Sequence, residues 1–279
     1  MMDMLKRRIL HVLKYLGALL ILGVFSFPYL IMILTSLKNR TEIFAIPPTF
    51  FPKVWQFQNF VDMWAKVPLA QYMSNSFVIA TCATSITLVC AIPAAYALAR
   101  MKFRGLNAYM YLVLVTQMFS PIVLLVGLFR VMGWFGLVDT IAGLIIVNAA
   151  FNQAFAVWIL KGYFSTIPYE LEQSAWIDGC NRVQGLFRVL LPLSAPGLIT
   201  ALIFVFIAAW NEFTFALTII STEAYKPLTV GIYAFFGKYD VQWQYLFAVS
   251  IVATVPVIAL FLGIEKHLAS GLTSGAVKE

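Results

Sequence analysis

Long apolar stretches recur along this chain of 279 residues, and the short segments between them hold most of its charged and turn-forming residues. A helix that crosses a bilayer needs about 20 mostly apolar residues. Six windows meet that requirement: residues 15–37, 74–99, 106–129, 137–160, 197–220 and 245–264. The pattern predicts a single all-α polytopic membrane domain over residues 1–279, with six transmembrane helices and a polar loop, 168–192, between spans four and five.

Composition supports a membrane protein. Hydrophobic residues make up 62% of the chain and charged residues 11%. A soluble domain of this size would have too much apolar surface to hide, so the bilayer is the expected solvent. The first window is longer than the apolar core of a cleavable signal peptide, and we interpret it as a retained first span.

The basic residues predict the orientation of the chain. Lys6, Arg7 and Arg8 precede the first window, and further basic residues lie between the second and third windows. By the positive-inside rule these segments are cytoplasmic, so six spans place both termini in the cytoplasm. The net charge of +7 does not predict a nucleic-acid partner, because the basic residues are dispersed at span ends.

Cysteine and histidine usage predicts no metal site. Cys82 and Cys90 lie two helical turns apart in one apolar window, and Cys180 lies in the 168–192 loop. This spacing indicates neither a disulfide framework nor a metal site. His11 and His267 both lie near predicted membrane boundaries, where an interfacial role is more usual than ligation.

The 168–192 loop contains helix start and stop signals that are typical of a helix-turn-helix. Pro168 suits a first helical turn, and the carboxylates of Glu170 and Glu172 complement the helix dipole there. Asp178 and Gly179 are expected to end this helix, because glycine readily adopts the left-handed conformation. A second helix is then expected to begin near Asn181.

That second helix is predicted to be amphipathic. Its apolar residues fall at helical spacing and form one stripe, which we expect to lie against the bundle. The stripe consists of Val183, Leu186, Phe187 and Leu190. An ordinary interfacial helix-turn-helix between two spans is the alternative interpretation.

The run from Glu172 to Pro192 resembles the EAA loop of the permease subunits of bacterial ABC importers, in which E-A-A, three residues and Gly precede a Leu-Pro pair. In this family a separate ATPase grips the loop in the cytoplasm. The E-A-A positions hold Gln173, Ser174 and Ala175, and the sequence leaves open whether Glu172 or Gln173 fills the acidic position. The resemblance implies ATPase-coupling roles for Glu170, Glu172, Gln173, Ser174, Ala175, Asp178, Gly179, Cys180, Leu191 and Pro192.

Further stretches are similar to the carbohydrate-uptake permeases of the maltose type. They are Phe44-Ala-Ile-Pro-Pro48, Gln117-Met-Phe-Ser-Pro121, Trp210-Asn-Glu-Phe213 and the tail from Gly271 to Lys278. The resemblance implies import of a sugar, as a di- or oligosaccharide, across the bacterial cytoplasmic (inner) membrane. It also implies a second homologous permease subunit, two copies of an ABC ATPase that the tail contacts, and an extracytoplasmic sugar-binding protein.

The chain has no nucleotide-binding signature of its own. It lacks the sequence G-x-x-x-x-G-K-[ST]. We therefore expect a permease that is not an enzyme and binds no cofactor, with ATP and Mg²⁺ in the partner ATPase.

Polar residues inside the predicted spans are candidates for the substrate path, because such groups are costly in hydrocarbon and usually face protein or water. They are Gln117, Asn148, Asn152, Trp210, Asn211 and Glu212. Amides and carboxylates beside aromatic faces suit a sugar. Hydrogen bonding between helices is the alternative role.

The two connections on the opposite side of the membrane remain open to two interpretations each. The aromatic residues between 38 and 72 form either an interfacial belt or a docking surface for an external partner. Residues 221–242 form either a lid or a plain connector.

Other solutes and other classes of protein remain as alternatives. An ABC permease for glycerol phosphate or a polyamine would carry the same loop. An ion-coupled secondary transporter would need no cytoplasmic helix-turn-helix, and its paired broken helices are not apparent here. A membrane-embedded enzyme would need a cluster of reactive side chains, and such residues are few and scattered.

Overall fold

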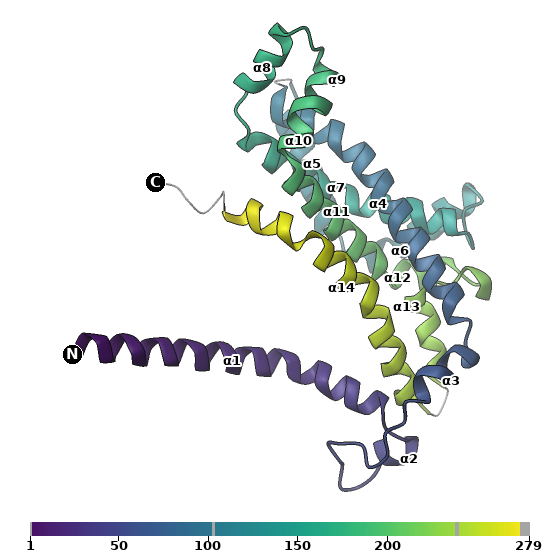
Figure 1. The fold of residues 1–279 in the computed structure, drawn as a ribbon. Helices are drawn as coiled ribbons and strands as arrows, with labels where there is room; N and C mark the ends of the chain where they lie inside the picture. Colours follow the sequence, from purple (N-terminus) through teal and green to yellow (C-terminus); the bar gives the residue numbers. More distant parts are fainter. Residues whose placement is uncertain (1, 102–103, 238–239, 274–279) are drawn as a thin grey trace. The chain divides into compact units, whose positions relative to one another are not determined.

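The computed structural model describes residues 2–101, 104–237 and 240–273, and in these ranges the chain is nearly all helical (Figure 1). It divides into two compact units. The first contains residues up to Pro68 together with Ile232–Thr254, and the second contains Leu69–Gly231 and the residues from Val255 onward. The expected all-helical class is confirmed. Within the described residues, the β-type pairing is limited to one bridge between Phe236 and Val241.

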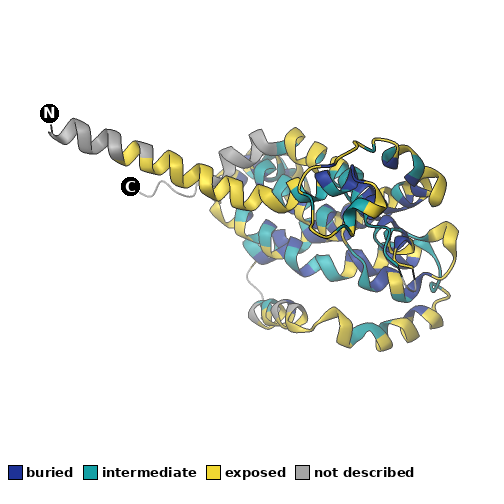
Figure 2. Ribbon diagram, turned by 90° about the horizontal axis from the view of Figure 1, so that it is seen from below, coloured by how far each residue is buried: buried dark blue, intermediate teal, exposed yellow. Residues whose placement is uncertain are grey.

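The first unit consists of a long helix, short helices and the start of the last helix. Its elements are α1 (Met2–Ser36), α2 (Arg40–Ile43), α3 (Asn59–Lys66), a 3-10 turn (Ile232–Phe235) and the first part of α14 (Trp243–Thr273). The described side chains of α1 are exposed from Leu10 to Leu30 (Figure 2). Because most of these residues are apolar, lipid or another protein is needed to cover them.

The second unit contains the remaining helices. These are α4 (Leu69–Arg100), α5 (Leu106–Met118), α6 (Pro121–Trp134), α7 (Ile141–Thr166), α8 (Glu170–Ile177), α9 (Arg182–Gly185), a π-helical turn (Leu186–Leu190), α10 (Leu191–Leu193), α11 (Ala195–Trp210), α12 (Thr214–Ile219), a 3-10 turn (Glu223–Tyr225) and α13 (Leu228–Gly231).

Helices α4, α7 and α11 pack against one another and form the centre of this unit. Small residues line the contact, including Ala91, Ala95, Ala156 and Ala201, all fully buried. Small side chains allow close approach of helix backbones, which is the usual basis of packing between helices in membranes. A second buried cluster joins Ile79, Leu144 and residues of α12.

Among the residues that the structure describes, four helices are long and apolar enough to cross a membrane: Leu13–Ser36, Leu69–Arg100, Ile141–Thr166 and Trp243–Ile264. The pair Arg182–Leu193 and Ala195–Trp210 also passes this test but is bent by 81°. The windows expected at 15–37, 74–99 and 245–264 lie within or overlap α1, α4 and α14. The window expected at 137–160 corresponds to α7, which begins later, at Ile141, and ends later, at Thr166. It begins there because Thr140 caps the helix by accepting a hydrogen bond from Gly143 N.

Two expected spans are not continuous helices. The window 106–129 is interrupted after Met118, and α6 begins at Pro121. Proline suits the first turn of a helix but lacks the N–H that would continue the preceding one, so the chain breaks there. The window 197–220 is interrupted between Trp210 and Thr214. The expectation of one unbroken helix in each window was wrong.

Candidate functional site

The first helix of the 168–192 loop ends as the sequence predicts. Helix α8 is capped at Asp178, and Gly179 follows with φ +89°. The N–H of Gly179 donates to the carbonyl of Trp176 at 3.1 Å, and that of Cys180 donates to the carbonyl of Ala175 at 2.9 Å. This pair of bonds is a Schellman motif, which reverses the chain within two residues.

The second half of the loop begins with a capping box. Asn181 accepts a hydrogen bond from Gln184 N at 2.8 Å, and the Gln184 side chain accepts one from Asn181 N at 2.9 Å. Both ends of the turn are therefore fixed by local hydrogen bonds.

The predicted apolar stripe is only half buried. Leu186 and Leu190 pack into the core of the second unit, whereas Val183 and Phe187 are exposed. The segment from Leu186 to Leu190 is π-helical, so its turn is wider than that of the α-helix assumed in the prediction. Two apolar side chains of the loop are consequently available to another molecule.

Helix α8 has an inner and an outer face. Glu172 and Ala175 are buried, whereas Glu170, Gln173, Ser174 and Asp178 are exposed. The Ser174 hydroxyl donates to the carbonyl of Glu170 at 3.0 Å. Gln173 therefore occupies the outer face, and Glu172 points into the protein.

Glu172 is paired with a residue that the sequence did not single out. Its Oε1 lies 2.5 Å from Arg100 Nε, at the end of α4. In the sequence, Arg100 is one of several basic residues between the second and third apolar windows. The two residues are far apart in the chain, so no local pattern signals the pair. Of the remaining loop candidates, Cys180 is half-buried at the turn, and Leu191 and Pro192 belong to α10 near the end of the loop.

Among the substrate-path candidates, Glu212 occupies the break between α11 and α12. Its carboxylate accepts hydrogen bonds from Phe215 N at 2.7 Å and Ala216 N at 3.0 Å. These are otherwise unpaired donors at the start of α12, so Glu212 acts as a cap. Its backbone carbonyl accepts a bond from Thr229 Oγ1 at 2.6 Å.

The neighbours of Glu212 lie in different surroundings. Trp210 is buried and stacked on Phe206, with 6.0 Å between the ring centroids. Asn211 is exposed. The break therefore brings an exposed amide next to a capped carboxylate.

The other two described amides bond to their own helix. Asn148 donates to the carbonyl of Leu144, and Asn152 donates to that of Asn148, each at 2.9 Å. Asn148 is buried, and Asn152 is half-buried. The side chain of Gln117 lies outside the described residues, as do residues 274–278 of the predicted ATPase-contacting tail.

The segment 221–227 is held by several side chains of the second unit. Asp139 accepts hydrogen bonds from the N–H groups of Ser221 and Thr222 at 2.8 and 2.9 Å. Asn75 donates to the carbonyls of Ala224 and Lys226 at 2.9 Å. These bonds favour an ordered connector over a mobile lid.

Glu223 adds a charged contact to this segment. Its carboxylate accepts hydrogen bonds from Lys226 Nζ and from the Tyr72 hydroxyl. The Lys226 ammonium, and then the Tyr72 hydroxyl, hold the pKa of Glu223 below its ordinary value. Glu223 therefore stays ionised at neutral pH.

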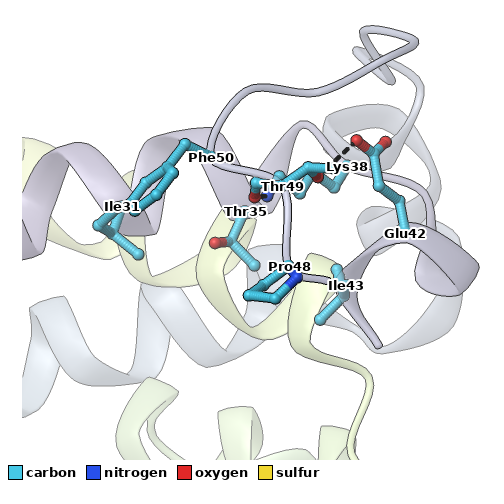
Figure 3. A pocket seen from close by; sticks show the side chains of 8 residues that line it. All are labelled: Ile31, Thr35, Lys38, Glu42, Ile43, Pro48, Thr49 and Phe50. Carbon is cyan, nitrogen blue, oxygen red and sulfur yellow. Dashed lines mark hydrogen bonds between the residues drawn. The ribbon is translucent and has the colours of Figure 1, made fainter. Parts of the chain in front are cut away.

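A hollow of about 260 Å³ lies in the first unit (Figure 3). Apolar residues such as Ile31 and Phe50 line it together with Lys38 and Glu42. Burial opposes ionisation of Glu42, but hydrogen bonds from Lys53 N and Thr49 Oγ1, with the charge of Lys38, keep the pKa of Glu42 below its usual value. Because Lys38, Glu42 and Thr49 already have hydrogen-bond partners, this hollow adds no chemistry to the candidate site.

Metal ligation and disulfide bonding play no visible part in the described chain. No group of three or more His, Cys, Asp or Glu side chains among these residues is arranged to hold a metal ion. Cys82, Cys90 and Cys180 are free thiols.

Comparisons with known proteins cover nearly the whole chain. Residues 21–274 match the family described as "Binding-protein-dependent transport system inner membrane component". The chain is 36% identical over 278 residues to the inner membrane ABC transporter permease protein YcjP of Escherichia coli K12, with 98% of each chain covered. It is 34% identical over 279 residues to the trehalose/maltose transport system permease protein MalG of Thermococcus litoralis, covering 99% of this chain and 98% of that protein.

A solved structure has a similar fold. It is a chain from the crystal structure of a bacterial ABC transporter involved in the import of the acidic polysaccharide alginate. The TM-score is 0.79 at 21% sequence identity, and the match covers 93% of this chain and 96% of that chain. At this level of identity the likeness concerns the fold alone.

Proposed function

Because this chain belongs to the family of binding-protein-dependent transport system inner membrane components, we propose that it is the permease subunit of an ATP-driven importer that carries a sugar across the cytoplasmic membrane. A di- or oligosaccharide is the proposed cargo. Support comes from the trehalose/maltose permease, which is 34% identical over 279 residues, and from the shared fold of the alginate importer. The protein itself is a permease and not an enzyme.

The proposed topology has six spans with both termini in the cytoplasm. They are α1, α4, the broken pair α5 and α6, α7, the broken pair α11 and α12, and α14. The apolar helices support this arrangement, and the basic residues near the start of α1 and the end of α4 supply its direction. In this topology the 168–192 loop is cytoplasmic.

The single observation that carries the proposed mechanism is the two-faced loop, whose turn is closed at both ends by local hydrogen bonds. Its outer face presents Gln173, Ser174 and Asp178, and its inner face is fixed to the bundle by Glu172. A partner ATPase that grips the outer face and closes on ATP with Mg²⁺ would displace the loop as one body. The displacement would reach α7 and α11 directly through the chain.

The proposed complex contains a second homologous permease, two copies of the ATPase and an extracytoplasmic sugar-binding protein. The family's description as a binding-protein-dependent system supports the last of these. The exposed apolar length of α1 is available for contact with a neighbouring subunit within the membrane. The exposed aromatic residues between 38 and 68 remain candidates for contact with the binding protein.

The proposed substrate path passes the break between α11 and α12. Asn211 is its exposed amide, and Glu212 keeps the break open by capping α12. Trp210, Asn148 and Asn152 are assigned supporting positions, since each already has a partner in the bundle. Gln117 remains a candidate from the sequence.

Mass spectrometry of the proteins that co-purify with this chain from its native membrane in mild detergent tests the proposal. We expect an ATPase, a second permease and a binding protein. The binding protein is then titrated with maltose, trehalose, glycerol 3-phosphate and spermidine. Retention of either disaccharide supports sugar import, whereas retention of only glycerol 3-phosphate or spermidine contradicts it. Recovery of an active chain without an ATPase would overturn the importer and favour ion-coupled transport.

A further inference from the structure

The buried ion pair between Arg100 and Glu172 joins two parts of the second unit that are distant in sequence. Arg100 is the last residue of α4, and Glu172 lies in the first turn of α8. Their side chains are 7% and 0% exposed, and Nε lies 2.5 Å from Oε1. A surface pair would be screened by water and salt, but this pair is enclosed by protein.

Both residues make additional bonds that fix their geometry. Arg100 Nη2 donates to the carbonyl of Ile167, just after α7, at 2.9 Å. The Tyr96 hydroxyl donates to the second carboxylate oxygen of Glu172 at 3.1 Å. A guanidinium presents its donors in a rigid plane, so one Arg100 side chain sets the positions of α7 and α8 against the end of α4.

Aromatic and cationic side chains extend this contact through the loop. The Arg100 guanidinium lies 5.7 Å from the centroid of the Tyr169 ring. The Tyr169 ring meets the Trp176 ring edge to face at 5.7 Å, and Arg182 lies 5.4 Å from the Trp176 centroid. Such contacts are favourable when the cation lies within about 6 Å of the ring. The contacts run without interruption from α4 to α9.

Gly185 packs closely against the Trp176 indole. A Cβ atom at this position would lie 3.3 Å from Trp176 Nε1. The absent side chain lets the indole pack between α8 and α9. The loop is therefore braced internally as well as being joined to α4.

The contacts of α4 deeper in the bundle are mostly apolar, although Thr87 Oγ1 donates a hydrogen bond to the carbonyl of Ala149 in α7 at 3.3 Å. There Ala91 and Ala95 pack in a cluster with Ala156 of α7 and Ala201 of α11. Small apolar surfaces allow close packing but supply little directional restraint on sliding along the helix axis. The ion pair and the Tyr96 hydroxyl bond to Glu172 are directional contacts that fix the register of α4 relative to the loop.

We propose that Arg100 and Glu172 are positioning residues that make α4 move with the 168–192 loop, so that closure of the ATPase drives α4 as well as α7 and α11. This proposal rests on the proposed function, because it names a route for motion that originates in the ATPase. Neither residue touches nucleotide or sugar. Their role is to convert a local displacement of α8 into movement of a third helix.

The test compares transport with ATP consumption. The complex is reconstituted with Arg100→Gln or Glu172→Gln, and Arg104→Gln is the matched control because Arg104 is an exposed arginine just beyond α4. We expect the two pair variants to retain basal ATP hydrolysis, while the sugar imported per ATP falls by about tenfold, within the usual range of coupling between distant sites. The control should match the wild type. Unchanged sugar per ATP in both pair variants overturns the proposal.

Arg100→Lys keeps the proposal testable if a neutral variant fails to assemble. Lysine retains the buried charge but not the planar fork, so it cannot reproduce both the Glu172 and the Ile167 contacts. We expect an assembled complex with sugar per ATP between that of the wild type and the neutral variants. An assembled Arg100→Lys complex with fully wild-type coupling would contradict the positioning role.

Spin labels give a readout that loss of stability alone would not produce. Met101 and Ile177 are exposed, at the ends of α4 and α8, and are replaced by cysteine in a transporting variant that lacks Cys82, Cys90 and Cys180. With Arg100 and Glu172 intact, ATP should leave the distance between the labels unchanged. With Glu172→Gln, ATP should shift or broaden it. An ATP-dependent distance in the intact pair overturns the proposal, whereas absence of ATP-driven uptake in the wild type counts against the proposed function instead.

Discussion

Glu212 caps α12 through Phe215: the backbone N–H of Phe215 donates to Glu212 Oε1 at 2.7 Å across the break in the fifth predicted span. A carboxylate within a predicted span is usually suspected of binding cargo or ions. Here both of its oxygens already accept backbone hydrogen bonds. These bonds indicate that the main role of Glu212 is to stabilise the start of α12 after the break.

Replacing Glu212 with alanine should therefore lower stability more than it changes sugar affinity. Loss of a helix cap costs about 0.5–2 kcal/mol, so the purified complex should melt at a lower temperature. Glu212→Gln retains an acceptor and should lose less. Thermal melting in detergent and the KM for sugar uptake are the two measurements. A raised KM with unchanged melting in Glu212→Gln would assign the carboxylate to the cargo instead.

A second prediction concerns Gly179 and the coupling of sugar uptake to the ATPase. The Gly179 φ of +89° is unfavourable for any residue with a side chain, although a Cβ there would meet no atom within 4 Å. Gly179→Val should therefore distort the turn of the loop at a backbone cost of about 1–3 kcal/mol. We expect membrane insertion to persist and sugar uptake to be lost.

The matched control for this variant is Gly105→Val. Gly105 also has a positive φ, +96°, and open space around its Cβ position, but it precedes α5 outside the 168–192 loop. Immunoblotting of membranes and uptake assays on both variants make the comparison. Equal uptake by the two variants would mean that the turn at Gly179 has no special part in coupling.

Close packing of α7 and α11 at Gly197 leads to a prediction about stability. A Cβ atom on Gly197 would lie 2.2 Å from Cγ of Tyr163 and 2.7 Å from its Cβ. Gly197→Ala should therefore force the helices apart, at about 1–3 kcal/mol for overpacking, and lower the melting temperature. Gly162→Ala, with no atom within 4 Å of the new methyl, should be neutral or stabilising. Equal melting of the two variants would contradict this packing.

The segment 221–227 should remain ordered across the physiological pH range. The pKa of Glu223 is lowered, mainly by its hydrogen bond with Lys226, so its contribution is present above the ordinary carboxyl pKa and is lost only as pH falls through the lowered value. Protection of the segment's amides in hydrogen exchange should thus be constant between about pH 5 and pH 8, once intrinsic exchange rates are corrected.

The substitution Asp139→Ala tests whether the contacts of Asp139 hold the segment 221–227 in place. It removes the acceptor for the N–H groups of Ser221 and Thr222 and should expose both amides to exchange. Wild-type protection in that variant would mean that the segment is held by other contacts. Loss of wild-type protection between pH 5 and pH 8 would contradict the role assigned to Glu223.

The sequence predicts local features of this molecule well. The helix-turn-helix at 168–192 depends on nearby signals, and the Asp178-Gly179 stop and the Asn181 cap are found in the structure, whereas Pro168 precedes α8 and does not lie in its first turn. The broken spans were missed because hydropathy alone measures apolar content and not helix continuity. Pro121 and the Asn211-Glu212 pair were the available signals of the two breaks.

The features that local sequence patterns did not predict are set by contacts between residues far apart in the chain. Whether Glu172 or Gln173 faces outward depends on how α8 packs, and Glu172 points inward because Arg100 lies at the end of α4. Tyr96 and Tyr169 surround that pair but have no pattern in sequence that marks them. The positions of Asp139 and Asn75 beneath residues 221–227 are likewise set by packing between distant segments.

The most direct test of ATP-driven sugar import is uptake by proteoliposomes. The purified complex, together with its binding protein, is reconstituted with ATP or ADP trapped in the compartment that the ATPase faces. A radiolabelled disaccharide that the binding protein retains is then added on the opposite side. We predict transfer of the sugar against its gradient only with ATP, and loss of that transfer in Gly179→Val. Accumulation that requires no ATP and instead follows an imposed proton or sodium gradient would contradict the account.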